Sequence, residues 1–541
     1  MGERVIPAVL ARRATDEPDR TAYLFLDENG AERTRLSYGE LHARACGVAA
    51  RLVEVCGPGD RALLLFGQGP EFVVAFLGCL YAQVVAVPVN PPRRNRVQDA
   101  TRAIVLDCEP AVVLTVAAML DHLRPAVEPL APGVHWMALD DLVPSPGEPR
   151  PVTADTLAFL QYTSGSTSTP RGVMVSHGNL AANQEMIRRT FGHDRDSTVV
   201  GWAPFFHDQG LIGNVLQPLW VGAASVQFSA MAFARRPLLW LAAISRYRAH
   251  TSGGPNFAFD ACVAAAARSG VPDVDLSSWQ VAFDGAEPVR PDTLRRFAET
   301  FAPAGFDPAA LHPCYGLAEA TLMVSGTGKL RGPRTTTDGA SGRVLAGSGV
   351  PVQPGAVRIV DPDTRSRCGP GEVGEIWVAG DHVAQGYWRR PDATEQTFRA
   401  ELDGVRHLRT GDLGVLVDGE LYVVGRLKDL VIVRGRNHYP HDIEHTATAA
   451  HPALRCCAAF AVPAPDGERL VVVAEVRREH RDTLDAREVV GSVRAAVVAE
   501  HATTGEVVLT SFGRLPMTSS GKIMRAATRA RYLDGEYAGK A

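Results

Sequence analysis

The chain has 541 residues, of which 46% are hydrophobic and 21% charged, and its formal net charge is -4. This length exceeds what one hydrophobic core normally serves, so we expect at least two domains. The near-neutral charge gives no electrostatic basis for binding nucleic acid or an anionic membrane surface.

Cysteine spacing and the first residues bear on the compartment. The nine cysteines include no CxxC pair, and their number is odd. This pattern predicts neither a zinc cage nor a secreted disulfide framework. The opening MGERVIPAVLARRATDEP lacks the apolar core of a signal peptide. We therefore expect a soluble cytoplasmic protein with reduced thiols.

The longest apolar stretch runs from Phe72 to Val89. Its first half, FVVAFLGCLYA, predicts a buried helix, and its second half, VVAVPV, predicts a buried parallel strand instead of a membrane span. Similar short runs recur with helical patterns between them: Ala62–Phe66, Val84–Val87, Val112–Thr115, Leu157–Tyr162, Thr198–Trp202 and Val281–Asp284. This alternation predicts an α/β fold with largely parallel sheets.

The pattern changes twice toward the C-terminus. Closely spaced strands with Gly/Pro turns over Val357–Ala379 indicate a small, more antiparallel β subdomain. Beyond Gly425–Asp429 (GRLKD), strands alternate with helical segments around Asp442–Ala450 and Leu484–Glu500. A segment of this size is sufficient for a small α+β domain. We therefore expect domains at residues 1–425 and 426–541.

The segment Leu160–Leu180, LQYTSGSTSTPRGVMVSHGNL, carries the first chemical signal. A buried strand is followed by a Thr/Ser/Gly loop, and a helix begins after Ser176. Backbone N–H groups and hydroxyls of such a loop can surround phosphates, and Arg171 adds positive charge. The loop is not a Walker A motif, and by itself it is equally typical of a flexible surface turn.

Within this segment, TSGSTSTPRGVMVSH resembles the phosphate loop of the adenylate-forming superfamily, which includes acyl-CoA synthetases, luciferases and peptide-synthetase adenylation domains. Further segments follow in the order of that family: WAPFFHDQG (Trp202–Gly210), DGAEP (Asp284–Pro288), YGLAE (Tyr315–Glu319), RTGDL (Arg409–Leu413), GRLKD (Gly425–Asp429) and LPMTSSGKIMR (Leu515–Arg525). Longer stretches such as CYGLAEATLMVSG and LKDLVIVRGRNHYPHDIE resemble one branch in particular, the fatty acyl-AMP ligases.

The resemblance implies an architecture and an activity. The architecture is a large N-terminal domain of layered α/β subdomains with a small β subdomain, followed by a small mobile α+β domain. The activity is ATP- and Mg²⁺-dependent conversion of a fatty acid to acyl-AMP, with release of pyrophosphate. The acyl group then passes to the phosphopantetheine of a separate holo acyl carrier protein, as in lipid metabolism or polyketide or lipopeptide biosynthesis.

The same resemblance assigns nucleotide and metal contacts. The nucleotide residues are Thr163, Ser164, Gly165, Ser166, Thr167 and Arg171 at the phosphates, Gly285, Ala286, Glu287, Tyr315 and Gly316 around adenine, and Asp412 and Arg426 at the ribose. An ionised Asp412 accepts hydrogen bonds from both ribose hydroxyls. Glu319 is a hard oxygen ligand for Mg²⁺, with Thr163 as its companion. An isolated Glu of this kind is more often a solvated surface residue.

Lys522 is the expected catalytic residue. Attack of a carboxylate on the α-phosphate joins two anions, and a lysine on a Ser/Gly loop can neutralise both in the transition state. His207 would orient the carboxylate or serve as a structural histidine. Phe206 and Phe257 would line the acyl pocket, although core packing explains them equally well. Lys428 occupies the hinge position of the family.

Two alternatives stay open at this point. An acyl-CoA ligase shares the first half-reaction but uses coenzyme A as acceptor. Fatty acyl-AMP ligases usually carry an insertion after YGLAEATL that hinders coenzyme A transfer, and Met323–Gly349 is shorter than that insertion; its Gly-, Thr- and Arg-rich sequence suggests a mobile loop. The other alternative, a catalytically silent acyl-nucleotide-binding protein, is disfavoured because Glu319, Asp412 and Lys522 are all present.

Overall fold

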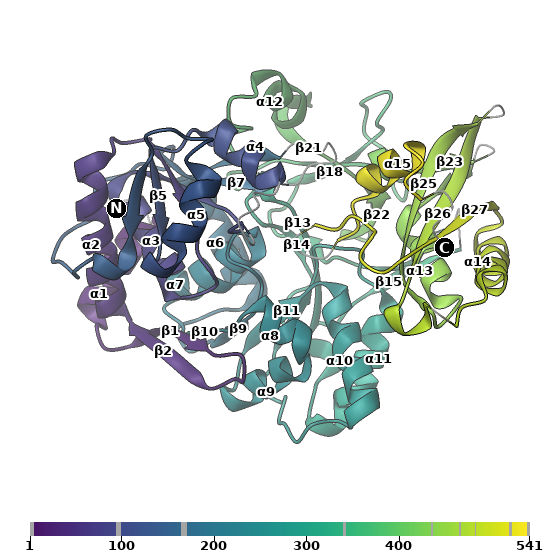
Figure 1. Cartoon of the computed structure of the whole chain (residues 1–541), viewed down its shortest axis with the longest axis horizontal. Coiled ribbons are helices and arrows are strands. Elements are labelled where there is room, and N and C mark those ends of the chain that lie inside the picture. The colour runs from purple at the N-terminus through teal and green to yellow at the C-terminus, as the bar shows by residue number, and fades with distance from the viewer. Residues whose placement is uncertain are drawn as a thin grey trace. The chain divides into compact units, whose positions relative to one another are not determined.

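A computed structural model describes residues 5–92, 99–163, 170–338, 342–433, 436–464, 467–481, 483–518 and 522–537. Contacts among these residues divide the chain into two compact units (Figure 1). The large unit holds the described residues up to 423 except Gly411–Leu413, and the small unit holds Gly411–Leu413 together with Val424 onward. The functional domains 1–425 and 426–541 stay a prediction, because contact density defines compact units and not activities.

A long twisted sheet organises one half of the large unit. Its strands are ordered β17-β14-β13-β12-β11-β9-β10-β1-β2, and β1, β2, β9 and β10 lie side by side in Figure 1. The central strands pair in parallel, as the apolar runs predict. The bounds are β1 (Thr21–Leu26), β2 (Glu32–Ser37), β9 (Val199–Gly201), β10 (Ser225–Gln227), β11 (Thr251–Gly254), β12 (Val281–Asp284), β13 (Leu311–Gly316), β14 (Met323–Gly326) and β17 (Val350–Pro351).

A second sheet of the large unit has the order β6-β5-β3-β4-β7-β8. Every residue of α3 (Pro70–Ala82) except Glu71 is buried, which explains why this helix is apolar on all sides. β4 follows it and pairs in parallel with β3 and β7, so the predicted helix and strand are confirmed. The bounds are β3 (Arg61–Leu64), β4 (Val85–Pro88), β5 (Val112–Thr115), β6 (His135–Ala138), β7 (Leu157–Thr163) and β8 (Arg171–Ser176).

Helices cover these sheets, and their starts follow from local sequence. α2 and α6 each begin with a capping box. The side chains of Ser37 and Ser176 accept the backbone N–H of the residue three positions on, and their own backbone N–H groups donate to the side chain of that residue. The helices of this unit are α1 (Ile6–Asp16), α2 (Tyr38–Val55), α3, α4 (Asp99–Cys108), α5 (Ala117–Val127), α6 (His177–Phe191), α7 (Gln217–Val221), α8 (Ala230–Arg235), α9 (Leu238–Arg246), α10 (Asn256–Ser269), α11 (Pro291–Phe301) and α12 (Pro391–Phe398).

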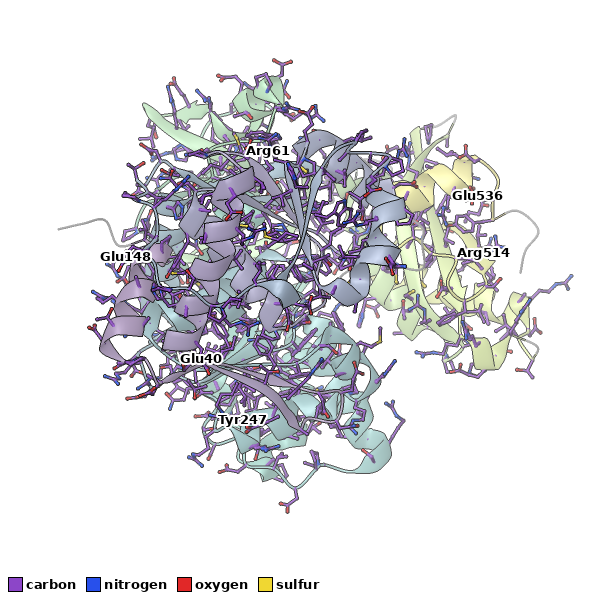
Figure 2. All side chains as sticks on the ribbon, turned by 60° about the vertical axis from the view of Figure 1, so that its left-hand side comes forward. Glu40, Arg61, Glu148, Tyr247, Arg514 and Glu536 are labelled. Atoms are coloured by element: carbon purple, nitrogen blue, oxygen red, sulfur yellow. The ribbon has the colours of Figure 1, made fainter. Side chains whose placement is uncertain are left out.

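Tyr247, which directly follows α9, connects this helix to β2, the strand at one edge of the long sheet. Its hydroxyl donates to Glu32 on β2 at 3.0 Å, and Figure 2 shows its position on the molecule. Two large clusters of buried apolar residues fill the large unit, and they lie between its helices and the strands of its two main sheets. Among the described helices, none is both long and apolar enough to cross a membrane.

The predicted small β subdomain is a sheet ordered β18-β19-β21-β20, with β22 paired to β21. The β18–β19 pair is antiparallel, as the spacing of the runs over Val357–Ala379 predicts. The β20–β21 pair, which lies beyond the predicted range, is also antiparallel. The bounds are β18 (Val357–Val360), β19 (Gly374–Val378), β20 (Ala400–Leu402), β21 (Val405–Val417) and β22 (Glu420–Arg426).

The segment Met323–Gly349 differs from the loop that its composition suggests. It begins with β14 and carries an antiparallel hairpin, β15 (Thr335–Thr337) with β16 (Val344–Ala346). Backbone bonds fix both ends: Gly332 N–H donates to Ala309 O, and Ser348 N–H donates to Leu421 O at 2.7 Å. The β-branched threonines that read as polar loop therefore serve as strand residues. Residues 339–341 lie outside the described residues.

The small unit is a three-layered α+β structure. β25 pairs antiparallel with β26, and β26 pairs in parallel with β27. Apolar clusters lie on both faces of this sheet. The bounds are β23 (Val431–Val433), β24 (Arg436–His438), β25 (Leu454–Ala464), β26 (Gly467–Val476), β27 (Gly505–Thr510), α13 (Pro440–Ala449), α14 (Ala486–His501) and α15 (Arg525–Leu533). The α/β class, with a large and a small part, is confirmed.

Candidate functional site

Several predicted motifs of the large unit meet at one edge of the long sheet. β9, β11, β12 and β13 run in parallel, and the register aligns Gly254, Asp284 and Pro313 across three of them. Each motif follows the carboxyl end of its strand, so DGAEP and YGLAE come together although they lie far apart in sequence. Ligands of open α/β sheets bind at this edge.

Close backbone approach explains the glycine of YGLAE. A Cβ atom on Gly316 would lie only 1.7 Å from the carbonyl oxygen of Leu322, so a larger residue cannot occupy this turn. Tyr315, the preceding residue on β13, is 9% exposed and packs in the core. On the neighbouring motif, Ala286 has φ +66°, a left-handed conformation that a non-glycine residue rarely adopts. Both turns are therefore fixed by their backbone geometry.

The side chain of Glu287 has a structural contact. Its Oε1 accepts the backbone N–H of Phe257, at the start of α10, at 2.7 Å. An acidic group at a helix N-terminus satisfies a donor that has no partner within the helix. This side chain therefore joins the ends of β11 and β12, and the expected role of Glu287 near adenine stays a prediction.

Glu319, Tyr387 and Arg171 form a contiguous chain of contacts. The Tyr387 hydroxyl donates to Glu319 Oε1 at 2.8 Å, and the Arg171 guanidinium lies over the Tyr387 ring, 5.2 Å from its centroid. Arg171 in turn pairs with Thr163 in the β7–β8 register. The structure thus brings three predicted residues together around Tyr387, a residue that the sequence analysis missed. The only feature of the sequence that could have drawn attention to Tyr387 is the aromatic pair Tyr387–Trp388 directly after Gly386.

Backbone bonds hold Tyr387 in this position. Ala384 N–H donates to Glu319 O at 2.9 Å, and Trp388 N–H donates to Gly172 O at 2.7 Å. Tyr387 itself bridges to Val173 of β8. Burial raises the pKa of the Tyr387 hydroxyl, and the neighbouring Glu319 carboxylate raises it further. The phenol therefore stays protonated and acts as a hydrogen-bond donor.

Asp284 ends β12 in an apolar environment. Its side chain is fully buried, and neither carboxylate oxygen has a hydrogen-bond partner among the described residues. Burial raises its pKa well above the ordinary value, and Glu287 and Asp260 add to the shift. Its surroundings therefore favour the neutral, protonated form of this carboxyl group. From the sequence, Asp284 is expected only as the last residue of a strand and the first residue of the DGAEP segment, with no role of its own.

His207 lies between a strand end and an unusual helix. It is half-buried, its ring centroid is 4.7 Å from that of Phe206, and its carbonyl accepts from Leu211 N–H. The following residues Gln209–Leu216 form a π-helix, a feature often found at functional sites. Phe206 O accepts a bond from Gln161 of β7 at 2.9 Å, which links the two sheets of the large unit.

Phe257 belongs to an aromatic group at the start of α10. Its ring packs edge-on against Trp202 and Phe233, while Trp202 and Phe233 stack with centroids 4.0 Å apart. Phe257 is 42% exposed, unlike its two neighbours, which are buried. A solvent-accessible aromatic ring beside buried ones is suited to an apolar ligand, but the acyl-pocket role of Phe206 and Phe257 stays a prediction.

The small unit contains the remaining predicted residues. Asp412 on β21 pairs with Arg426 at the end of β22, with Nε and Oδ1 separated by 2.9 Å. The Asp412 side chain is 9% exposed and that of Arg426 is 60% exposed. Lys428 lies in the short helix Leu427–Asp429, and Lys522 lies on an exposed turn before α15. Ser164, Gly165, Ser166 and Thr167 lie outside the described residues.

Comparison with known proteins identifies the family. A family described as AMP-binding enzyme matches residues 10–388, and the AMP domain of Disco-interacting protein 2-like proteins matches residues 428–541. The chain belongs to the AMP-binding enzyme family. The two matches together span most of the chain, in the large and the small unit.

Two relatives and one solved structure are similar over nearly their whole lengths. The medium-chain-fatty-acid–[acyl-carrier-protein] ligase JamA of Moorena producens is 42% identical, with 97% of this chain and 95% of the relative covered. The long-chain-fatty-acid–AMP ligase FadD26 of Mycobacterium marinum is 40% identical, with 98% and 97% covered. A fatty acyl-adenylate ligase of Legionella pneumophila, solved with acyl adenylate and pyrophosphate, is 38% identical with a TM-score of 0.77, with 98% and 96% covered. The predicted resemblance to the fatty acyl-AMP ligases is confirmed.

Proposed function

We propose that this protein activates a fatty acid with ATP, forming acyl-AMP and pyrophosphate, and then transfers the acyl group to the phosphopantetheine thiol of a separate holo acyl carrier protein. The observation that carries the proposal is the full-length similarity to JamA and FadD26, which are named as ligases of fatty acids. A relative solved with acyl adenylate and pyrophosphate supports the first step. The charged residues to which the proposal assigns metal, nucleotide and catalytic roles, Glu319, Asp412 and Lys522, are all present.

ATP would bind at the strand edge of the large unit. Tyr315 and Gly316 supply one wall for adenine, and Gly285, Ala286 and Glu287 supply backbone groups opposite. The loop of Ser164–Thr167, with Thr163 and Arg171 at its ends, would surround the phosphates. Arg171 suits this role because a guanidinium matches phosphate oxygens in two-point hydrogen bonds. Asp412 and Arg426 would hold the ribose.

Glu319 and Thr163 fit a Mg²⁺ ion that is shared with the phosphates of ATP. Both offer hard oxygen ligands, and Mg²⁺ in such enzymes is commonly held by one or two carboxylates together with substrate phosphates. Tyr387 restricts the orientation of the Glu319 carboxylate through the bond at 2.8 Å. The ion would supply charge neutralisation for the phosphate oxygens.

The chain's own cations would act in the first half-reaction. The fatty carboxylate attacks the α-phosphorus, the new C–O–P linkage forms, and the bond to the β-phosphate oxygen breaks to release pyrophosphate. Lys522 would stabilise the charge on the attacking carboxylate and the α-phosphate oxygens. His207 would orient the acid, whose chain would pass along Phe206 and Phe257. Lys428 would act as the hinge between the two half-reactions.

A panel of saturated acids of increasing length tests the first half-reaction. The purified enzyme is given ATP, Mg²⁺ and one acid at a time, and both pyrophosphate and acyl-AMP are measured, the latter by mass spectrometry. We expect acyl-AMP from fatty acids in the absence of any thiol. Pyrophosphate release without acyl-AMP for every acid, or no reaction with any acid, would contradict the proposal.

The acceptor is tested separately, by offering preformed acyl-AMP with either holo carrier protein or coenzyme A. Both acceptors end in the same thiol, so selectivity must come from contacts away from the sulfur. We expect the thioester of the carrier protein to form faster. Efficient acyl-CoA formation, without product on any of several carriers, would instead identify an acyl-CoA ligase. Removal of the hairpin β15–β16 should admit coenzyme A if this segment restrains the second half-reaction.

A further inference from the structure

The turn that carries Lys522 is closed by its own backbone. Thr518 N–H donates to Lys522 O at 2.8 Å, and Lys522 N–H donates to the Thr518 hydroxyl at 3.0 Å. Met517 and Ile523 form a bridge across the turn. Ser519–Gly521 lie outside the described residues, but the two arms on either side of them are defined. The position of Lys522 therefore depends on how these two arms are fastened to the small unit.

The first arm is fastened by a buried carboxylate. Glu475 on β26 has a side chain that is 0% exposed; one oxygen accepts the N–H of Leu515 at 3.0 Å, and the other pairs with Arg455 of β25. Arg455 also donates to the sulfur of Met517 and lies over the ring of Phe512. Arg514, labelled in Figure 2, begins this arm.

The second arm is fastened by Arg525, three residues after Lys522. Its guanidinium binds Glu444 of α13 in a two-point interaction, with Nε to Oε1 at 2.6 Å and Nη2 to Oε2 at 2.7 Å. Its remaining nitrogen, Nη1, donates to Asp429 Oδ2 at 2.8 Å. A planar guanidinium can make this combination, whereas a lysine ammonium cannot. Glu444 is itself fixed, because its Oε1 also accepts Ala459 N–H of β25.

Asp429 links this network to a short helix near the start of the small unit's C-terminal run, which begins at Val424. It ends the short helix Leu427–Asp429 and directly follows Lys428, the proposed hinge. One guanidinium therefore connects the lysine-bearing turn, α13 and the residue next to the hinge. A change in backbone direction at residues 427–429 would move Asp429, and the planar guanidinium of Arg525 would transmit this displacement to the turn that carries Lys522.

We propose that Arg525 is a positioning residue for Lys522, and that through Asp429 it couples the orientation of the lysine-bearing turn to the hinge segment. The inference rests on the proposed function, in which Lys522 acts in adenylation. Arg525 would not touch the substrate. Its effect would pass through Lys522, because a displacement of about 1 Å of a reacting group can cost on the order of a hundredfold in rate.

The test uses Arg525→Lys in the full-length enzyme, because this variant keeps the positive charge among Glu444 and Asp429. We expect acyl-AMP formation to fall by about ten- to a hundredfold. ATP affinity and acyl transfer from supplied acyl-AMP should change by less than about twofold, because neither depends on Lys522. Arg529→Lys on the same helix is the matched control, since Arg529 is exposed and donates only to Ala461 O in the described contacts. Circular dichroism melting curves should show both variants folded.

A double-variant comparison separates positioning from general weakening of the fold. In the Lys522→Ala background, adding Arg525→Lys should lower acyl-AMP formation by less than about threefold, because the group through which it acts is gone. Equal losses in both backgrounds, a parallel loss of both half-reactions, or wild-type adenylation in Arg525→Lys would each overturn the proposal. A wild-type enzyme that forms no acyl-AMP would instead overturn the proposed function.

Asp429→Asn tests the link to the hinge. It keeps the size of the side chain but removes its charge, so the bond to Arg525 weakens while the two-point pair with Glu444 remains. We expect adenylation to fall by about three- to tenfold, in line with a weakened charged hydrogen bond. If Arg525→Lys impairs adenylation and Asp429→Asn does not, Arg525 acts through Glu444 alone and the coupling to the hinge is refuted.

Discussion

The nucleotide edge of the large unit and the lysine turn of the small unit are built in different ways. At the edge, the ends of β12 and β13 fix DGAEP and YGLAE through backbone register, and Gly316 allows a turn that a Cβ would prevent. The lysine turn instead depends on ion pairs between buried carboxylates and half-buried arginines, Glu475 with Arg455 and Glu444 with Arg525. Apart from positions such as Gly316, a turn fixed by backbone geometry does not depend on particular side chains, whereas a buried charge that loses its partner is costly. Conservative substitutions at the lysine turn should therefore disturb its geometry more than conservative substitutions disturb the nucleotide edge.

Lys522→Ala should cause the largest loss. Acyl-AMP formation should fall by about a hundred- to a thousandfold, the scale for losing one donor that stabilises transition-state charge. ATP affinity should change far less, because the interaction strengthens only as charge develops. The rate of pyrophosphate release measures adenylation, and equilibrium binding measures the affinity for ATP. Wild-type pyrophosphate release from the variant would exclude Lys522 as the catalytic residue.

In the large unit, Glu319 and Tyr387 allow a proposed metal ligand to be compared with the residue that orients it. Glu319→Ala should raise the Mg²⁺ concentration for half-maximal activity by about a hundredfold, and Tyr387→Phe by about tenfold, because the phenol orients the ligand without touching the ion. Mg²⁺ titrations at saturating ATP measure both. Tyr247→Phe is the matched control, because it also removes a Tyr–Glu bond, to Glu32 at 3.0 Å. An unchanged metal requirement in Glu319→Ala would remove Glu319 from the metal site.

Asp412→Asn should weaken ATP binding by about tenfold, since a charged acceptor of the ribose hydroxyls becomes neutral. The preference among fatty acids of different length and the Mg²⁺ concentration for half-maximal activity should both be unaffected. Isothermal titration with ATP gives the affinity, and Asp418→Asn, at an exposed turn of the same hairpin, serves as the control. Unaltered ATP affinity in Asp412→Asn would show that the ion pair with Arg426 is purely structural.

Acid should destabilise the large unit through buried histidines. Burial lowers the pKa of His193 to about 3, of His250 to about 4 and of His312 to about 3, from an ordinary value near 6.5. These rings stay neutral in the fold but take up protons in the unfolded chain. Their contribution to stability is therefore complete above pH 6.5 and is lost as the pH falls from 6.5 toward 3, by about 1.4 kcal/mol per pH unit for each histidine.

Tryptophan fluorescence reports this effect selectively, because all seven tryptophans precede residue 389, in the large unit. The denaturant midpoint followed by fluorescence should fall between pH 6.5 and 4. His312→Phe should reduce the pH dependence, since His312 packs edge-on against Phe191 with centroids 4.7 Å apart and a phenyl ring retains that contact. The exposed His135→Gln should leave it unchanged. The same pH dependence in both variants would contradict the assignment.

Much of the α/β framework could be predicted from the sequence. β5 and β12 have the predicted bounds, and β7 extends one residue further, to Thr163. Such strands are buried on both faces, so an apolar run marks them directly. The α13 and α14 helices also begin within two residues of their predicted starts. At the sheet edge the motif order was sufficient, because backbone register brings the motifs together.

Side-chain networks could not be predicted in this way. Tyr387 lies 68 residues from Glu319, and Arg525 lies 81 and 96 residues from Glu444 and Asp429. Contacts over such separations depend on how whole elements pack, which periodicity does not encode. The hairpin β15–β16 was read as a loop because its threonines and glycines are typical of both.

We propose that the turn carrying Lys522 serves adenylation and not acyl transfer. Measuring both half-reactions of Lys522→Ala tests it most directly. One assay follows acyl-AMP formation from acid and ATP, and the other follows thioester formation from supplied acyl-AMP and holo carrier protein. We expect a loss of about a hundredfold or more in the first assay and less than about threefold in the second. Equal losses in the two half-reactions would contradict it.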